Sequence, residues 1–404
     1  MKTVGRWRVV LALLPTLVGV AACQTGDKEQ ASGEAVYGQP LAQQFHAAQQ
    51  ATREAGTAGF VATLTYRSAV GDAVHTTIGS QDYAAGSARG SSTLRVPTDF
   101  PEPAAEFLAE PGTTARQTLA TVGGDVYVKE DAAEWLRFTP EAFNEFGDAT
   151  SALSVHAAGD AAPYSGTLAD LVTRAVPREK PKRDADGNHT YRVTVLPEFA
   201  AELLPLRARA AGKAGMGTEP VDMTVTLDAE GRLARATADL DPLLSHMDLI
   251  GVTGLQASYQ LSAFGEPYAH PMPGEDGVRV EDARKVLALT GTLKGGQCAA
   301  MEAALDSRAV VRPVDCAKAH DMRVFAQVAV DRTVPGRTAV KSGLDYAREE
   351  CEREATVAPK EWFADSRRGV AWAVTGRSEE QSSTGGGRTD TTVTGAYTCY
   401  VPTS

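Results

Sequence analysis

VDMTVTLDAEGRLARATADL, Val221–Leu240, is the stretch that decides the fold of this chain. As far as Leu227 it alternates apolar and polar side chains, a period of two that is typical of a strand with one buried face. Asp228–Gly231 then forms a polar turn, and a second run begins at Leu233. Two such runs joined by a short turn that contains glycine predict a β-hairpin, and therefore an antiparallel sheet.

The same period of two appears on both sides of this hairpin. The clearest run is Leu255–Ala263, where every second residue is apolar and the residues between them are Gln or Ser. Further strands are predicted at Phe60–Arg67 and Tyr191–Val195, and a second hairpin joins Val126–Val128 to Trp135–Phe138. The repeated alternation predicts a large antiparallel sheet with one apolar face.

Three helical segments interrupt the strands. Apolar residues recur at helical spacing over Leu41–Ala55, and a second helix is predicted over Thr167–Arg174. A third is predicted over Glu198–Lys213, where Pro205 would kink or divide it. Helices combined with antiparallel strands place this part of the chain in the α+β class.

The N-terminal segment has a charged start, a short apolar run and a cysteine. Lys2, Arg6 and Arg8 precede the apolar run Val9–Val20, and Cys23 follows two alanines. This arrangement resembles the lipobox of a bacterial lipoprotein signal peptide; the alternative is an ordinary secretory signal with a chance cysteine. The resemblance implies cleavage before Cys23 and a diacylglycerol on its sulfur. This lipid would then anchor the chain to the outer face of the cytoplasmic membrane.

Length and composition indicate an exported chain with more than one domain. The chain has 404 residues, and a domain with a single hydrophobic core rarely reaches this length. A formal net charge of −11, without a dense cluster of Lys and Arg, argues against nucleic acid and anionic lipid headgroups as partners. After Cys23 no apolar run is long enough to span a membrane.

The other four cysteines all lie in the last quarter of the chain, and they are Cys298, Cys316, Cys351 and Cys399. An even number in an exported chain predicts two disulfides. Four cysteines allow three pairings, among which the sequence does not choose; we favour Cys298 with Cys316 and Cys351 with Cys399. A zinc site that combines these cysteines with His320 is the alternative, but no close Cys-x-x-Cys pair is present to begin it. No metal and no cofactor are therefore predicted.

The order of the segments resembles the exported lipoproteins that have the fold of periplasmic lipoprotein carriers, including the mycobacterial glycolipid-binding lipoproteins. The resemblance covers roughly residues 36–275 and is most specific at Val221–Leu240 and Leu255–Pro267. It implies a curved, open antiparallel sheet, a half-barrel, wrapped over helices. It also implies an apolar cavity between sheet and helices that accepts a lipid or glycolipid ligand, whose binding residues are unknown.

A run rich in proline and glycine follows this region and predicts a connection between domains. It contains Pro271, Pro273, Gly274 and Gly277. The predicted organisation is a signal peptide at 1–22, the lipidated cysteine and a flexible tether at 23–37, a lipoprotein-carrier-like domain at 38–270, a linker at 271–279 and a second domain at 280–404.

The second domain is predicted to be a small α+β unit held by disulfides. A helix is expected over Val280–Leu289 and a second one after a cap at Ser342. Strands are expected over Met322–Val330, Val370–Val374 and Val393–Tyr400, with a hydrophilic loop over Gly376–Asp390. The cysteine spacing and VDCAKAHDMRVFAQV, Val314–Val328, resemble the septum-formation-type extracellular domain of actinobacterial membrane proteins. That resemblance implies no established chemistry.

Motifs for catalysis are absent from the sequence. It has no G-x-S-x-G, P-loop, G-x-G-x-x-G or H-E-x-x-H pattern. His320 beside Asp321 is the one suggestive pair, and a structural role for it is favoured because adjacent side chains usually point apart. No catalytic residue is predicted, and we expect the protein not to be an enzyme. Two functions are weighed: a carrier or sensor of a lipid or other hydrophobic ligand, and a ligand-free envelope scaffold with a protein partner near cell-wall or septal machinery.

Overall fold

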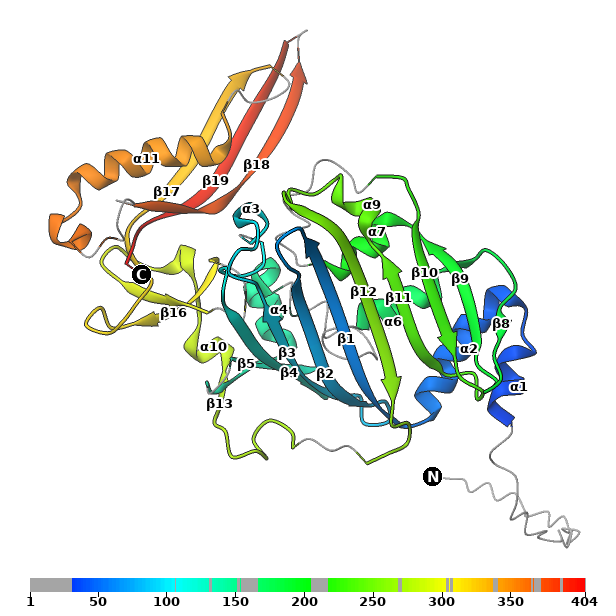
Figure 1. Ribbon diagram of the computed structural model, residues 1–404. Coiled ribbons are helices and arrows are strands. Elements are labelled where there is room, and N and C mark those ends of the chain that lie inside the picture. The colour runs from blue at the N-terminus through cyan, green and yellow to red at the C-terminus, as the bar shows by residue number, and fades with distance from the viewer. Residues whose placement is uncertain are drawn as a thin grey trace, which may run out of the picture.

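The computed structural model describes residues 31–105, 107–130, 133–150, 153, 166–204, 217–267, 271–302, 305, 308–336, 341–364, 366, 372–385 and 388–403. The predicted signal peptide, with Cys23, lies outside these residues, as does the part of the third predicted helix after Leu204. The chain forms two sheets, a large one of 13 strands and a small one of 6 strands (Figure 1).

The large sheet is built almost entirely from antiparallel neighbours. Its order is β13-β6-β5-β4-β3-β2-β1-β12-β11-β10-β9-β7, with β8 also paired to β9. The strands are β1 (Thr57–Ser68), β2 (Ala73–Asp82), β3 (Ser87–Arg95), β4 (Thr114–Val122), β5 (Asp125–Glu130), β6 (Trp135–Phe138), β7 (Val176–Pro177), β8 (Lys182–Arg183), β9 (His189–Val195), β10 (Val221–Leu227), β11 (Leu233–Asp239), β12 (Val252–Ser262) and β13 (Val280–Asp282). β13 joins β6 in parallel. The pairing of β1 with β12, from Gly59 opposite Ser262 to Arg67 opposite Gly254, joins segments far apart in the sequence.

The hairpin predicted over Val221–Leu240 is present as β10 and β11, paired from Asp222 opposite Asp239. Its turn is closed by a hydrogen bond of 2.9 Å from the amide of Gly231 to the carbonyl of Asp228. Gly231 has a φ of 80°, a left-handed conformation that glycine adopts without steric cost. A Cβ at this position would also lie 2.7 Å from the side chain of Val36, so α1 packs closely on the turn. The prediction of a flexible tether as far as residue 37 is therefore wrong for Ala31–Tyr37, which form a helix with Val36 buried.

Helices cover one face of the large sheet, and the other face is bare in Figure 1. The helical segments of this part are α1 (Ala31–Tyr37), α2 (Leu41–Glu54), α3 (Glu102–Ala105), α4 (Pro140–Phe146), η1 (Gly147–Thr150), α6 (Gly166–Arg174), α7 (Pro197–Ala200), η2 (Ala201–Leu203) and α9 (Asp241–Leu244). Of these, α6 lies behind β11 and β12, and α2 lies behind β11 and toward the edge strand β7. The helices predicted over Leu41–Ala55 and Thr167–Arg174 are confirmed.

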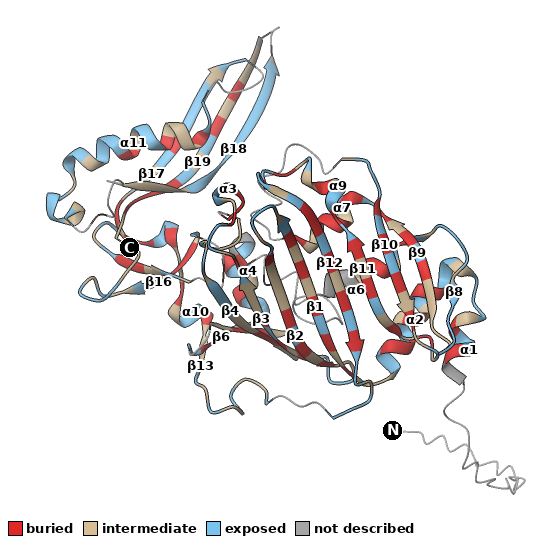
Figure 2. Cartoon of the chain, viewed as in Figure 1, coloured by how far each residue is buried: buried red, intermediate tan, exposed pale blue. Residues whose placement is uncertain are grey.

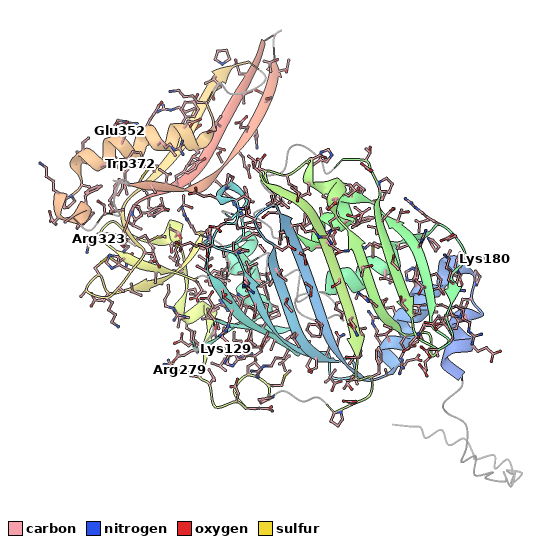
Figure 3. The ribbon with its side chains drawn as sticks, viewed as in Figure 1. Lys129, Lys180, Arg279, Arg323, Glu352 and Trp372 are labelled. Atoms are coloured by element: carbon pink, nitrogen blue, oxygen red, sulfur yellow. A yellow bond between two sulfur atoms is a disulfide. The ribbon has the colours of Figure 1, made fainter. Side chains whose placement is uncertain are left out.

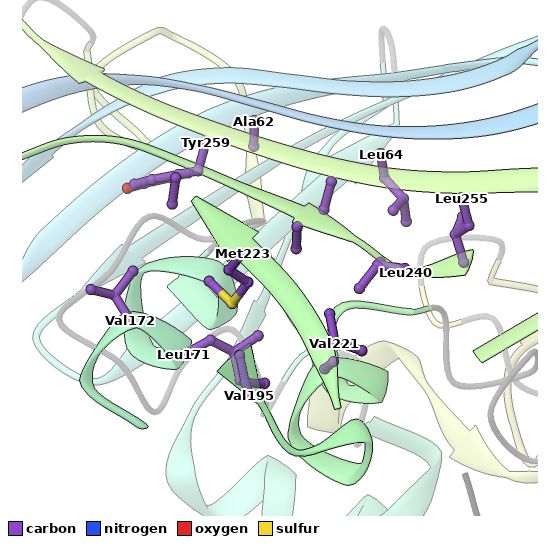
Figure 4. Packing of buried hydrophobic residues seen from close by; sticks show 14 of the residues in the cluster. Ala62, Leu64, Leu171, Val172, Val195, Val221, Met223, Leu240, Leu255 and Tyr259 are labelled. Atoms are coloured by element: carbon purple, nitrogen blue, oxygen red, sulfur yellow. The ribbon is translucent and has the colours of Figure 1, made fainter. Parts of the chain in front are cut away.

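The main core lies between the covered face of the sheet and these helices (Figure 2). Along β1, the residues that the alternation assigns to the buried face, Phe60, Ala62, Leu64 and Tyr66, are all buried. Close by, Leu171 and Val172 of α6 face Met223 and Val195 (Figure 4). The predicted fold class, an open antiparallel sheet over helices with a smaller disulfide-bonded α+β unit, is confirmed.

The small sheet has the order β14-β16-β15-β17-β19-β18. Its strands are β14 (Ala288–Leu289), β15 (Cys298–Met301), β16 (Val310–Val314), β17 (Met322–Pro335), β18 (Ala373–Gly385) and β19 (Arg388–Pro402), and its helical segments are α10 (Ala283–Val286), η3 (Thr290–Thr292), α11 (Gly343–Val357) and η5 (Lys360–Phe363). Helix α11 begins at the predicted cap, where Ser342 and Asp345 form a capping box. The structure contains the disulfides Cys298–Cys316 and Cys351–Cys399, which is the pairing that we favoured.

Two predictions for the second domain are wrong. The helix expected over Val280–Leu289 is a single turn, α10, between β13 and β14, because the residues on either side pair with neighbouring strands. The loop expected over Gly376–Asp390 is instead most of β18 and the start of β19, which pair from Ala373 opposite Tyr400 to Gly385 opposite Arg388. Polar side chains suit this hairpin because backbone hydrogen bonds, rather than burial, hold its outer part.

A second apolar cluster connects the two sheets. Leu136 and Phe138 of β6 pack in one buried cluster with Ala283, Leu287 and other residues from the small unit. Arg312 reinforces this junction by pairing with Glu281 at 2.7 Å. The boundary at 279/280 stays a prediction, and the residues just after it are packed against the large sheet.

Candidate ligand-binding site

A small cavity lies between the covered face of the large sheet and helices α2 and α6. Its apolar lining includes Phe45 and Ala48 of α2, Val172 of α6 and Leu261 of β12. The cavity volume is about 30 Å³, which is about the volume that one water molecule occupies in the liquid.

Helix α2, on one side of the cavity, is fixed to the sheet by buried contacts. The ring of Phe45 packs edge-on against Tyr191, with 5.0 Å between centroids. The hydroxyl of Tyr191 donates a 2.6 Å hydrogen bond to Oε1 of Gln44, and the amide of Leu233 donates to Oγ1 of Thr52 at 2.9 Å. These contacts reach β9 and β11, so α2 is a fixed wall of the cavity.

Helix α6, on the other side, is attached differently. Its residues Leu171 and Val172 are buried in the core, and its C-terminal end is held by an ion pair of 3.3 Å between Arg174 and Glu202. Both charged side chains are about two-fifths exposed, and exposed ion pairs contribute little to stability. Burial of Leu171 and Val172, rather than this ion pair, therefore holds α6 to the core.

Polar side chains converge on the same cavity. Gln81 of β2, Tyr83, Tyr259 of β12, Asp170 of α6 and Arg53 of α2 all line it. Nε2 of Gln81 donates hydrogen bonds to the hydroxyls of Tyr83 and Tyr259 at 2.7 and 3.3 Å. Oε1 of Gln81 is buried without a hydrogen-bond partner among the described residues. The cavity therefore combines an apolar lining with one polar side, the usual composition of a small-molecule site.

Burial changes the ionisation of these polar groups. It raises the pKa of the Asp170 carboxyl, an effect that Arg174 and Arg53 oppose by stabilising the charged form. Burial also raises the pKa of the Tyr83 and Tyr259 phenols. Removal from water is the leading cause for all three groups, of which Tyr259 is fully buried and Tyr83 and Asp170 are half-buried.

In this closed form the cavity is too small for an acyl chain. An apolar cavity of about 150 Å³ is known to bind a ligand as small as benzene, and the volume here is about 30 Å³. The floor near the cavity is built from small side chains, including Ala62, Ala236, Ala238 and Ala257, all buried.

The predicted site residues fall in different places. Cys23 lies outside the described residues, so its lipidation stays a prediction. All four remaining cysteines form disulfides, so none can supply the thiolate that the zinc alternative needs. His320 and Asp321 do not face one another: Nδ1 of His320 lies 2.7 Å from the carbonyl of Lys318, and Oδ2 of Asp321 accepts from the amide of Met301.

The polar side of the cavity was not found from the sequence. Gln81 follows the strand alternation of β2, but nothing in the sequence distinguishes it from the polar residues of the bare face. Asp170 and Tyr259 come from elements far from it in the sequence, and only the fold brings the three together.

Two other kinds of site were sought in the described part of the chain. No group of three or more His, Cys, Asp and Glu side chains there could hold a metal ion. Among those same residues, no helix has both the length and the apolar character needed to cross a membrane.

Comparison with known proteins gives only remote similarity. No protein-family model and no curated protein matches the sequence. Among solved structures, the complex of Pseudomonas aeruginosa MucA and MucB contains a chain 12% identical to this one, with a TM-score of 0.25; the match covers 88% of this chain and 93% of that one. A structure of MucB with MucA(peri) gives 11% identity and a TM-score of 0.21, covering 86% and 89%.

A DUF1329 family protein from Desulfovibrio piger is 10% identical, with a TM-score of 0.24, and the match covers 61% of this chain and 99% of that one. Similarity at these TM-scores carries no argument about this protein, so the function is argued from its own residues.

Proposed function

We propose that this protein is an extracytoplasmic, membrane-anchored lipoprotein whose first domain takes up a lipid or other hydrophobic ligand between the large sheet and α6. The observation that carries the proposal is the composition of the cavity, an apolar lining with Gln81, Tyr83 and Tyr259 on one buried side. The apolar part would receive a hydrocarbon chain, and the polar side would receive its polar end. The proposal assigns binding to the domain and no catalysis.

Entry of the ligand would require α6 to move. Leu171 and Val172 would leave the core, and the ligand would replace their contacts with the alanine-rich floor. An apolar chain recovers the hydrophobic contribution that the two side chains lose, so the exchange costs little once a ligand is present. Anchoring through Cys23 would keep the domain close to the membrane from which such a ligand comes.

A ligand-free envelope scaffold is the second candidate, and the small volume of the cavity favours it. In that case the interior is simply a packed core, and function lies in binding an envelope protein partner. The two candidates differ in whether the protein binds an acyl chain at all.

A matched pair of variants tests the proposal. Ala169 lines the cavity and is partly exposed, so the added ring of Ala169→Phe would occupy the cavity. Gln50→Phe adds the same ring to an exposed position of α2 away from the cavity. Both would be titrated with cis-parinaric acid, a fluorescent fatty acid, as chains that begin at Gln24.

We expect the parent chain and Gln50→Phe to bind the probe equally, and Ala169→Phe to bind at least about ten times more weakly, a loss of about 1.4 kcal/mol. Thermal unfolding temperatures of the three proteins should agree. Absence of probe binding in all three would contradict the proposal and favour the scaffold.

A further inference from the structure

The two disulfides of the small unit differ in their surroundings. Cys351 and Cys399 are both fully buried, between α11 and β19. In the other pair Cys298 is buried on β15, but Cys316 is partly exposed in the segment after β16. Of the four cysteines, Cys316 is therefore the one most accessible to a nucleophile from solvent; its Sγ lies 3.3 Å from the carbonyl oxygen of Gly296.

A cation lies next to the buried sulfur of that pair. Nε of Arg323 lies 3.2 Å from Sγ of Cys298, and Arg323 is labelled in the small sheet in Figure 3. The contact is set by the sheet, because Cys298 of β15 and Arg323 of β17 are directly opposite in the antiparallel register. Side chains opposite one another across two strands share a face, so the guanidinium is held beside the sulfur by backbone pairing.

The two sulfurs of Cys298–Cys316 differ in exposure and in nearby charge, and both differences affect thiol–disulfide exchange. A nearby arginine stabilises a thiolate, and a disulfide breaks faster when its leaving sulfur is the better stabilised one. Cys316 is the accessible sulfur, and Cys298 is the sulfur beside the positive charge. Attack on Sγ of Cys316, with Sγ of Cys298 as the leaving group, is therefore the favoured direction.

We propose that Cys298–Cys316 is a thiol–disulfide exchange site whose co-substrate is a dithiol. One thiolate of the dithiol attacks Sγ of Cys316, the bond between the two cysteines breaks, and its electron pair stays on Sγ of Cys298 beside Arg323. The second thiolate of the dithiol then attacks the first sulfur of the dithiol, which is bonded to Sγ of Cys316 in the mixed disulfide. That bond breaks, and Cys316 leaves as a thiolate. The dithiol is oxidised to a disulfide, this pair is reduced by two electrons, and the two protons go to the thiolates or to solvent.

Reduction would release a short segment without dismantling the sheet. Residues 315–320 lie between β16 and β17, and the disulfide ties them to β15. The pairing of β15 with β16, including Cys298 opposite Val314, consists of backbone hydrogen bonds and does not need the sulfur bond. The segment around Lys318 would lose its covalent tie to β15, while the hydrogen bond that the Thr403 hydroxyl donates to the His320 carbonyl and the core around Cys351–Cys399 stay in place.

The test is selective reduction of the folded chain. The protein is incubated with increasing dithiothreitol, blocked with N-ethylmaleimide, and mapped by mass spectrometry for label on each cysteine. We expect Cys298 and Cys316 to be labelled at least about ten times faster than Cys351 and Cys399. Labelling of all four cysteines together, only under conditions that unfold the protein, would overturn the proposal.

Arg323→Gln tests the role of the cation. It should slow reduction of Cys298–Cys316 by about three- to tenfold, and Arg323→Lys should restore part of the rate. Arg332→Gln is the matched control, because Arg332 lies on the same strand, pairs with Glu350 at 2.9 Å and carries the same charge. An Arg323→Gln rate equal to that of the control would overturn the assignment, and the comparison of the two disulfides in the parent chain holds even if this variant does not fold.

Discussion

The indole nitrogen of Trp135 donates a hydrogen bond of 3.0 Å to Oδ2 of Asp276, which lies 141 residues later in the chain. Trp135 is fully buried, and the cationic groups of Arg89 and Lys129 lie 5.2 and 5.0 Å from its ring centroid. Lys129 is labelled close to β5 in Figure 3. Asp276 belongs to the predicted linker, so that segment is attached to the large sheet.

Trp135→Phe should therefore weaken both the sheet and the attachment of the linker. The variant loses the hydrogen bond to a charged group and part of a buried ring, which together correspond to about 2–3 kcal/mol of unfolding free energy. Urea denaturation measures the loss, and limited proteolysis should show faster cleavage within residues 271–279. A variant with the parent's urea midpoint and cleavage rate would show that the contact with Asp276 is not stabilising.

A pH dependence of stability is expected from His75. Burial lowers the pKa of its imidazole from 6.5 to about 4. Below pH 6.5 the His75 imidazole is protonated in the unfolded chain, but in the folded chain it is protonated only below about pH 4. Acidification between these two values therefore favours unfolding. Between pH 7 and pH 4 the stability of His75→Gln should fall by about 3 kcal/mol less than that of the parent.

The control for this prediction is His46→Gln, which changes an exposed histidine of α2. Its unfolding free energy should follow the parent's at each pH. If His75→Gln also follows the parent throughout, His75 does not control acid stability.

The buried disulfide should contribute more to stability than the accessible one. Cys351–Cys399 closes a loop of 48 residues and Cys298–Cys316 a loop of 18. Loop-closure entropy gives about 4 kcal/mol for the first and about 3 kcal/mol for the second. Cys351→Ala with Cys399→Val should therefore lower the urea midpoint more than Cys298→Ala with Cys316→Ala. The reverse order would show that strain or residual structure outweighs chain entropy here.

The sequence predicts β1, β5, β6 and β9 to β12 of the large sheet because burial on one face gives these strands their alternation, but it does not predict β2, β3 or β4. Phe60 and Tyr66 on β1 and Tyr259 on β12 lie on the face that alternation assigns to them. The pattern predicts only the first residues of β18, through the strand expected over Val370–Val374, and not the rest of it, whose side chains are mostly polar. Backbone pairing with β19 makes that segment a strand, and such pairing leaves no trace in hydropathy.

The candidate site could not be predicted from the sequence for a different reason. Gln81 and Tyr259 are 178 residues apart, and their contact depends on the position of β1 between β2 and β12. The resemblance to lipoprotein carriers implies a cavity in this place, but the volume of that cavity depends on how α6 packs. Side-chain packing of this kind follows from the folded structure and not from residue types alone.

The measurement that tests the central claim most directly is native mass spectrometry, with lipid extraction, of the chain from Gln24 onward, produced in an oxidising compartment of a bacterium. The account predicts a bound mass that partitions into organic solvent, present in the parent and in Gln50→Phe and reduced in Ala169→Phe. A ligand-free mass for the parent, together with no binding of added cis-parinaric acid, would contradict it and identify the interior as a packed core.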